Sequence, residues 1–485
     1  MIPEIPGILS KGGEPMETVF SHEEMMEMFR DVADFTVRRL KCGPATLWAY
    51  AIDGLTSGGD ISEYIFRPVT EHLNGATVEA LYTEALEGGI YNSVASPCKG
   101  LQDAALKLVN GFCVILFPGT GAIAFEVKTG DKRGPSAPAL ENTVKGPKDA
   151  FVETIRTNTS LVRRHLRTPG LCLREMTVGR RSITNVTLVW IRDITSDKLV
   201  QLMEQRVRSI DLDGLLSPAA VEEYVTGSRM TAFPLLQYTE RADTFAAGLL
   251  DGRVGLLVDG LPLGYLAPVD LGYLMQSPED RSRDYLSASA VKLLRWGALL
   301  VDLLLPGLYV ALAMHHPDML FEELKGTVME GISQIPFSPG GEAVAMLVAF
   351  ELLQESGIHL PQAIGQSVST IGGIVVGSAA VEAGLISPIA LIAVSIAGVC
   401  GFVLPNRDVA NAIRLWRFFI TLTAWAAGLW GAAGASVLLI IRLLTLKSMG
   451  IPYLTLRREA VLRPRLEHQK WRNRRFFPKD EKNQK

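Results

Sequence analysis

The sequence of 485 residues has few cysteines, and no two of the five stand in a C-x-x-C pair. An odd count at such wide spacing does not fit a disulfide framework and favours a reducing compartment. The first residues, Met1 to Gly13, also lack the apolar core of a secretory signal peptide. We therefore expect the N-terminal part to stay in the cytoplasm, with the first hydrophobic run acting as its own insertion signal.

Motifs of common enzyme classes are missing as well. There is no P-loop, and no Ser/His/Asp or paired-carboxylate pattern stands out. The stretch from Gly119 to Ala124 matches the relaxed G-x-G-x-x-A dinucleotide fingerprint, but a strand pattern follows it where that motif needs a helix, which favours a hairpin. His315 and His316 have no further ligand at useful spacing, so a polar loop is favoured over a metal site. Neither enzymatic activity nor a cofactor is expected.

Charge is absent from three long stretches in the C-terminal part, residues 363–381, 385–406 and 418–441. A fourth apolar stretch, Trp296 to Met314, contains one charged residue, Asp302. Each matches the roughly 20 apolar residues that cross a bilayer core. Backbone polar groups in lipid must be paired within the segment, so these stretches should be helical.

The N-terminal part has a different pattern. Strands and helices alternate through residues 40–270, which predicts an α/β fold in two lobes. Within it, Glu17 to Leu40 is expected to be one amphipathic helix. The expected divisions are a disordered N-terminus, two cytoplasmic α/β lobes, an all-α transmembrane domain of four to six helices and a basic cytoplasmic tail, at residues 1–15, 16–135, 136–290, 291–446 and 447–485.

The number of crossings stays open at this stage. The stretch from Glu342 to Gly357 carries two further glutamates and is interpreted as a re-entrant or interfacial element. Four crossings then return the tail, which has twelve Lys or Arg against four Asp or Glu from Lys447 onward, to the cytoplasm. They also leave the arginines between residues 407 and 417 outside. Six crossings, with 342–357 spanning and a hairpin at Gly428 to Gly434, place them inside.

Polar residues within the apolar stretches are the candidate functional residues. Asp302 either faces protein or water inside the membrane, or lies hydrated near the cytoplasmic end. In 363–381, small and hydroxylated residues recur, and G-x-x-x-G spacing joins two glycines. They suit close helix packing or a narrow aqueous pore. The candidate pore-lining residues are Ser367, Ser369, Thr370, Gly373 and Gly377.

Long, ordered motifs give the chain a resemblance to a known family. They include the stretches 141–151, 178–182, 211–214, 238–241, 251–254, 304–310, 360–366 and 444–454. In these, from about Phe29 to Leu456, the chain resembles the A subunit of the GerA family of spore germinant receptors. The related SpoVAF-like branch shares the pattern. Residues 315–339 depart from the family's smoother apolar helix.

The resemblance implies a function in nutrient-triggered germination at the spore inner membrane. It implies a homo-oligomer that forms or gates an ion-conducting path, with a transporter-like B subunit, a lipoprotein C subunit and the lipid bilayer as partners, and no nucleic acid. A secondary transporter component and a membrane-anchored scaffold for other germination proteins remain as alternatives.

Overall fold

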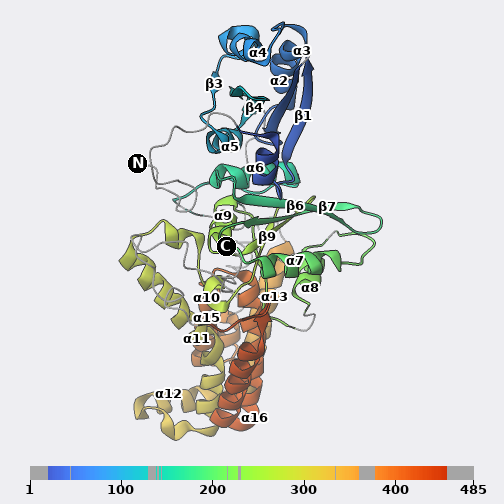
Figure 1. Ribbon diagram of the computed structural model, residues 1–485. Helices are drawn as coiled ribbons and strands as arrows, with labels where there is room; N and C mark the ends of the chain where they lie inside the picture. Colours follow the sequence, from blue (N-terminus) through green and yellow to red (C-terminus); the bar gives the residue numbers. More distant parts are fainter. Residues whose placement is uncertain are drawn as a thin grey trace, which may run out of the picture.

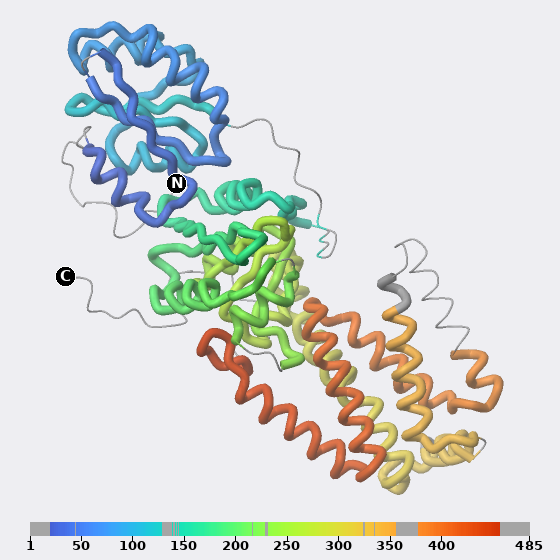
Figure 2. The backbone as a smooth tube through the Cα atoms, turned by 90° about the vertical axis from the view of Figure 1, so that its right-hand side faces the viewer, coloured from blue at the N-terminus to red at the C-terminus, as the bar shows by residue number. Residues whose placement is uncertain are grey.

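The computed structural model describes residues 20–43, 45–128, 138, 141, 143, 145–215, 217–227, 231–333, 335–359 and 377–455. Figures 1 and 2 show an elongated molecule in which a first α/β lobe, a second α/β lobe and a helical bundle follow one another along the long axis. The first lobe and the bundle lie at opposite ends.

The first lobe is a five-stranded antiparallel sheet in the order β1-β2-β4-β5-β3. Its strands are β1 (Phe35–Cys42), β2 (Ala45–Ile52), β3 (Ala95–Pro97), β4 (Phe112–Phe117) and β5 (Gly121–Glu126). Successive residues point to opposite faces of a strand, so Ala49 of β2 and Tyr50 enter different apolar clusters. Its helices are α1 (His22–Met28), α2 (Gly58–Ile61), η1 (Ser62–Phe66), α3 (Arg67–Glu71), α4 (Val78–Glu84), η2 (Ala85–Gly89) and α5 (Leu101–Val109).

One expectation in this lobe is wrong. A capping box at Ser21 and Glu24 begins a helix, but the helix ends at Met28 instead of continuing to Leu40. Phe35–Cys42 is instead the edge strand β1, paired along its length with β2. The strand is stabilised on both faces of the sheet, because Phe35 and Val37 pack against one apolar cluster and Leu40 and Cys42 against the other. Helical periodicity within the segment does not include these tertiary contacts. The G-x-G-x-x-A stretch is the β4–β5 hairpin, as expected.

The second lobe repeats the plan with a five-stranded antiparallel sheet in the order β6-β7-β9-β10-β8. Helices α6 and α9 cover one face and α7 and α8 the other. Its elements are α6 (Ile155–His165), β6 (Leu171–Val178), β7 (Thr184–Ile191), α7 (Asp197–Arg208), α8 (Pro218–Thr226), β8 (Gln237–Thr239), α9 (Ala242–Leu250), β9 (Val254–Val258), β10 (Gly264–Ala267), α10 (Leu271–Leu274) and η3 (Pro278–Arg281).

The C-terminal part is a helical bundle closed by a small strand pair. Within the described residues, two helices, α11 and α16, are long and apolar enough to span a membrane. The elements are α11 (Tyr285–His315), η4 (Pro317–Met319), α12 (Glu322–Ser333), α13 (Pro339–His359), α15 (Pro388–Gly401), α16 (Arg407–Thr445), β11 (Lys447–Ser448) and β12 (Ile451–Pro452).

Helix α16 is a hairpin. Its backbone leaves the helical conformation at Ala427 and Gly428, where φ of Gly428 is +61°. Figure 2 shows the two arms running side by side. Both ends reach the second lobe. Val409 belongs to the same apolar cluster as Leu271 of α10, and the Ser448 hydroxyl donates to the Leu235 carbonyl at 2.7 Å. The uninterrupted span expected over 418–441 is therefore wrong, and the hairpin alternative describes the structure.

The stretch 342–357, interpreted as an interfacial or re-entrant element, is part of a longer helix, and its relation to the membrane stays a prediction. These residues belong to the 21-residue helix α13, which lies within the bundle between α11, α15 and α16. Its first turn is at the end away from the lobes, where Gly340 packs against the Trp425 ring beside the α16 turn. Further along, Glu351 reaches Arg414 in the first arm of α16. α13 thus runs along the bundle toward the lobes.

Candidate functional site

A buried ion pair lies inside the helical bundle. Asp302 of α11 is fully buried, and its Oδ1 accepts a hydrogen bond of 2.5 Å from Nη1 of Arg417 in the first arm of α16. Arg417 is itself 3% exposed. Asp302 therefore faces protein, and its charge is balanced by a residue 115 positions away in the sequence. A buried pair of this kind is costly to form and far more costly to break.

A second ion pair lies beside the first. Nη1 of Arg414 is 3.1 Å from Oε1 of Glu351 in α13. Arg414 and Arg417 are three residues apart and so share one helix face. The Glu351 side chain is 42% exposed, which places this pair nearer the bundle surface. Together the two pairs tie α11, α13 and α16 with four charges.

Both ion pairs include buried polar atoms that lack a hydrogen-bond partner. Among the described residues, Oδ2 of Asp302, Nε of Arg417 and Oε2 of Glu351 are buried without a hydrogen-bond partner. A Cβ placed on Gly401 of α15 would lie 3.1 Å from Asp302 Oδ2, so a fourth helix also approaches the carboxylate closely. Ionisable groups in this setting mark ion pathways or moving parts more often than static packing.

The expected pore-lining residues fall largely elsewhere. Ser367, Ser369, Thr370 and Gly373 lie outside the described residues. Gly377 is buried and helical, and a Cβ there would be 3.5 Å from the Leu391 side chain in the first turn of α15. Asp302 meets α15 at its other end, so the structure does not bring Gly377 and Asp302 together.

Sequence reasoning did not find the partners of Asp302. The arginines of α16 stood out only because four crossings would have left them on the wrong side. The signal that was present is an acidic residue, Asp302, in one apolar stretch and a basic residue, Arg417, directly before another. Opposite charges in separate apolar segments find their lowest free energy by pairing, since either alone would be uncompensated in a medium of low dielectric constant.

Another buried ion pair joins the two α/β lobes. Arg163 of α6 donates from Nε and Nη2 to the two oxygens of Asp34, at 2.5 and 2.6 Å, and both side chains are 1% exposed. Next to it, Val32 forms a parallel bridge with Leu173 of β6, and the Ala33 amide donates to the Leu173 carbonyl at 2.9 Å. The chain before β1 therefore extends the edge of the second sheet.

The motifs at 141–151 and 238–241 meet at one place. The Arg241 guanidinium donates to the carbonyl of Glu141, to Thr143 and to the carbonyl of Pro147, so it holds the connection between the lobes. The Glu141 carboxyl also accepts a hydrogen bond from the Thr239 hydroxyl. Burial raises the pKa of Glu141 to about 7, because the charged form loses hydration.

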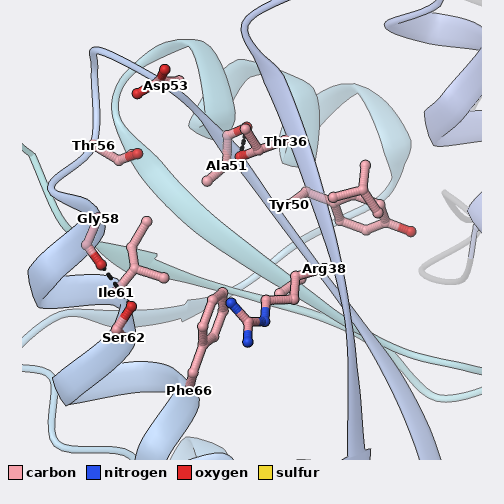
Figure 3. A pocket seen from close by; sticks show the side chains of 12 residues that line it. Thr36, Arg38, Tyr50, Ala51, Asp53, Thr56, Gly58, Ile61, Ser62 and Phe66 are labelled. Carbon is pink, nitrogen blue, oxygen red and sulfur yellow. Dashed lines mark hydrogen bonds between the residues drawn. The ribbon is translucent and has the colours of Figure 1, made fainter.

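A surface pocket of about 320 Å³ opens in the first lobe (Figure 3). The hydroxyl groups of its two threonines and its serine are committed to the backbone: Thr36 donates to the Ala51 carbonyl at 3.0 Å, Thr56 to the Ile52 carbonyl at 3.0 Å and Ser62 to the Gly58 carbonyl at 2.9 Å. Arg38 stacks over the Phe66 ring, 5.4 Å from its centroid. These contacts support the fold and bring no nucleophile, base and acid together. Within the part of the chain that the structure describes, no three His, Cys, Asp or Glu side chains gather as a metal site would need.

Comparison with known proteins completes the description. A family model described as Bacillus/Clostridium GerA spore germination protein matches residues 23–473. The chain belongs to the GerA family. The match includes both lobes and the helical bundle, so the ion pairs described above lie in the shared part. Family membership supports a germinant receptor subunit.

Relatives are similar over most of their length. The uncharacterized membrane protein YfkQ of Bacillus subtilis (strain 168) is 34% identical over 83% of this chain and 79% of its own. Spore germination protein B1 of the same organism is 32% identical over 83% of each chain. A crystal structure of the N-terminal domain of the A subunit of the Bacillus megaterium spore germinant receptor GerK3 aligns with 53% of this chain and 96% of that chain, at 27% identity and a TM-score of 0.41.

Proposed function

We propose that this GerA-family chain is the A-type subunit of a spore germinant receptor and oligomerises to form or gate an ion-conducting path. The observation that carries the proposal is the buried Asp302–Arg417 pair inside the helical bundle. A pair that costs free energy to bury is retained where it orders a moving or conducting part of a membrane domain.

The path of the helices supports a six-crossing topology. α11 leaves the second lobe and α13 returns toward it, while both ends of the α16 hairpin lie against that lobe. With the lobes in the cytoplasm, Arg407, Arg414 and Arg417 then lie at the cytoplasmic end of α16, in agreement with the positive-inside rule. The proposed location is the spore inner membrane, with the tail also cytoplasmic.

The lobes and the bundle are joined where gating would act. The Ser448 hydroxyl, directly after α16, accepts from the Val269 amide at 3.0 Å and donates to the Leu235 carbonyl. The Leu271 amide donates to the Tyr453 carbonyl at 2.9 Å. A ligand-driven shift of the lobes would therefore be transmitted to α16, provided the ligand binds one state better than the other.

The remaining parts of the proposal follow the family resemblance. The ligand-sensing partner is a B subunit of transporter type, and a lipoprotein C subunit completes the receptor. The 363–381 stretch, with Ser367, Ser369, Thr370 and Gly373, lines the conducting path. Gly377, in the described end of that stretch, lies against Leu391 of α15.

Two measurements test the proposal. In spores that carry the variant as their only copy, Asp302→Asn should strongly reduce germinant-triggered ion release, because it leaves Arg417 uncompensated. The matched control is Asp318→Asn, which breaks an exposed pair with Lys325 at 2.6 Å and should leave release unchanged. Full-length protein in detergent should scatter light as a ring of several copies. A stable monomer, or normal release by Asp302→Asn, would favour the scaffold alternative.

A further inference from the structure

The sheet of the first lobe has two edges that differ in charge. In the order β1-β2-β4-β5-β3, β1 is one edge strand and β3 is the other. Figure 1 shows these strands on opposite sides of the lobe, with β1 running roughly along the long axis of the molecule. Both edges therefore face sideways, so a second copy that stands beside this one in the same membrane meets these edges.

The edge at β1 is basic. Its eight residues include Arg38, Arg39 and Lys41, all exposed, and no acidic residue. Arg38 stacks over the Phe66 ring, and Arg39 donates to the Thr46 hydroxyl at 3.5 Å. Within the described residues, no carboxylate pairs with Lys41 or with either arginine. Because β2 is the only described strand that pairs with β1, alternate backbone amides of β1 also point outward without a strand partner.

The edge at β3 is acidic. Residues 68–98, which include the helices and the connection beside β3, contain four glutamates and no lysine or arginine. Two of these glutamates are engaged within the lobe, because Glu71 pairs with a neighbouring arginine and Glu84 accepts from a backbone amide. Glu87 of η2, a helix that contacts β3, is exposed and has no cationic partner in the part of the chain that the structure describes. This edge thus offers a negative charge where β1 offers positive ones.

The same edge also exposes apolar side chains. Leu86, Tyr91 and Val94 are 37%, 62% and 40% exposed. Val94 lies directly before β3, and its carbonyl accepts from the Glu126 amide at 3.2 Å, so it continues the line of the strand. Basic residues on an edge strand also serve to prevent unspecific pairing. That explanation covers β1 but not the apolar and acidic surface at the opposite edge, which indicates a partner.

We propose that the β1 edge of one copy of this chain docks against the β3 edge of the next copy. The basic side chains of β1 contact Glu87, and an arginine guanidinium stacks on the exposed Tyr91 ring. Because the two surfaces differ, the contact is head-to-tail, and its repetition closes a ring if the rotation between neighbours allows. The inference rests on the proposed function and deepens it, since it assigns the surface through which the oligomer forms.

The position of the contact has a consequence for the bundles. The first lobe lies at the end of the molecule opposite the bundle (Figure 2). An eight-residue strand spans about 26 Å, a length that suits a standard interface of about 800 Å² per partner. Association through the first lobes therefore brings the bundles together around a common axis, and it does not require the bundles themselves to supply the contact.

The first test is cross-linking of full-length protein in detergent with a bifunctional maleimide. Lys41→Cys/Glu87→Cys carries a reactive cysteine on each edge and should form a ladder of dimers, trimers and larger species. Neither single variant should cross-link alone, and a mixture of the two should stop at dimers. Lys41→Cys/Glu27→Cys is the control, because α1 packs over a face of the sheet, and it should form no ladder. The unchanged protein sets the background, since Cys400 is its one cysteine that is not buried.

A charge exchange tests the same contact without added cysteines. Glu87→Lys should lower the association constant of full-length protein about two- to fivefold, the range that one exposed ion pair supplies. Lys41→Glu should have the same effect. The combined variant Lys41→Glu/Glu87→Lys should associate like the unchanged protein, because each copy then presents the reversed charges to its neighbour. A combined variant that associates as weakly as the single variants would overturn the inference.

The outcomes separate this inference from the proposed function. Rings in light scattering that yield no ladder would show that another surface joins the copies, so the inference would be wrong while the proposed function stands. A stable monomer would contradict both. Dimers of Lys41→Cys alone would show that two β1 edges meet each other, and cross-links from either edge to a different receptor subunit would assign the edge to that subunit. Each of these last two results overturns the inference.

Discussion

The ion pair between the two α/β lobes offers a matched test of how much burial changes the effect of an ion pair on the free energy of unfolding. Asp34 and Arg163 form two hydrogen bonds, of 2.5 and 2.6 Å, with both side chains 1% exposed. Arg180 and Asp211 form the same two-bonded pair, at 2.7 and 2.8 Å, with side chains 70% and 65% exposed. The pairs share chemistry and geometry and differ in access to water.

The change is Asp34→Asn, with Asp211→Asn as its control. Asparagine keeps the size of the side chain and removes its charge, which leaves Arg163 uncompensated in the interior. Removing one partner of a buried pair costs about 3–5 kcal/mol, whereas an exposed pair contributes about 0–1 kcal/mol. The buried guanidinium cannot recover its lost partner by hydration, and its Nη1 already has no hydrogen-bond partner among the described residues.

The assay is unfolding of full-length protein in detergent, followed by circular dichroism. Asp34→Asn should lower the unfolding temperature of the lobes by on the order of 10 °C, and Asp211→Asn by roughly 0–4 °C. A double variant that also carries Arg163→Met should recover part of the loss, because an apolar replacement of both partners removes the unpaired charge. Equal losses for Asp34→Asn and Asp211→Asn would refute the reasoning.

Two further predictions follow from single positions. Gly428→Val should reduce the yield of folded protein, because φ of Gly428 is +61° and a Cβ there would lie 2.9 Å from the His315 side chain. Gly434, which is helical and has no atom within 4 Å of an added Cβ, should accept alanine. Cross-linking between the two arms of α16 would report the difference between the two variants. Glu141→Gln should gain stability over the unchanged protein as pH rises from about 4.3 to the pKa of about 7, and the gain should level off above it. Burial disfavours the charged carboxylate there, so unfolding temperatures that stay equal across this window would contradict the assignment.

Sequence patterns predicted the soluble fold where local and tertiary preferences agree. The hairpin favoured over a dinucleotide site at 119–124 joins β4 and β5. Periodicity failed at β1, because the residues before Leu40 fit one face of a helix and one face of a sheet equally well. Only pairing with β2 decides between them, and that pairing is not a property of the segment itself.

The bundle shows the same limit more sharply. Length and lack of charge identified the apolar segments but could not decide between one span over 418–441 and a hairpin at Gly428 to Gly434, because an uncharged stretch with several glycines is compatible with both. Nor could composition show that Asp302 meets Arg417, since the contact joins segments 115 residues apart. Each decision depends on which segments pack together, so the candidate site became visible only with the fold.

Two buried acidic residues, Asp302 and Glu342, lie at different levels of the bundle. Toward the lobes, Asp302 and Arg417 compensate each other, so a movement of α16 against α11 must break a strong interaction and is expected to be all-or-none. Farther from the lobes, Glu342 is buried with its Oε2 accepting a hydrogen bond from the Ser387 amide, which links α13 to α15. Such an arrangement suits a receptor subunit better than a passive scaffold, because a scaffold would gain stability from apolar residues at both positions.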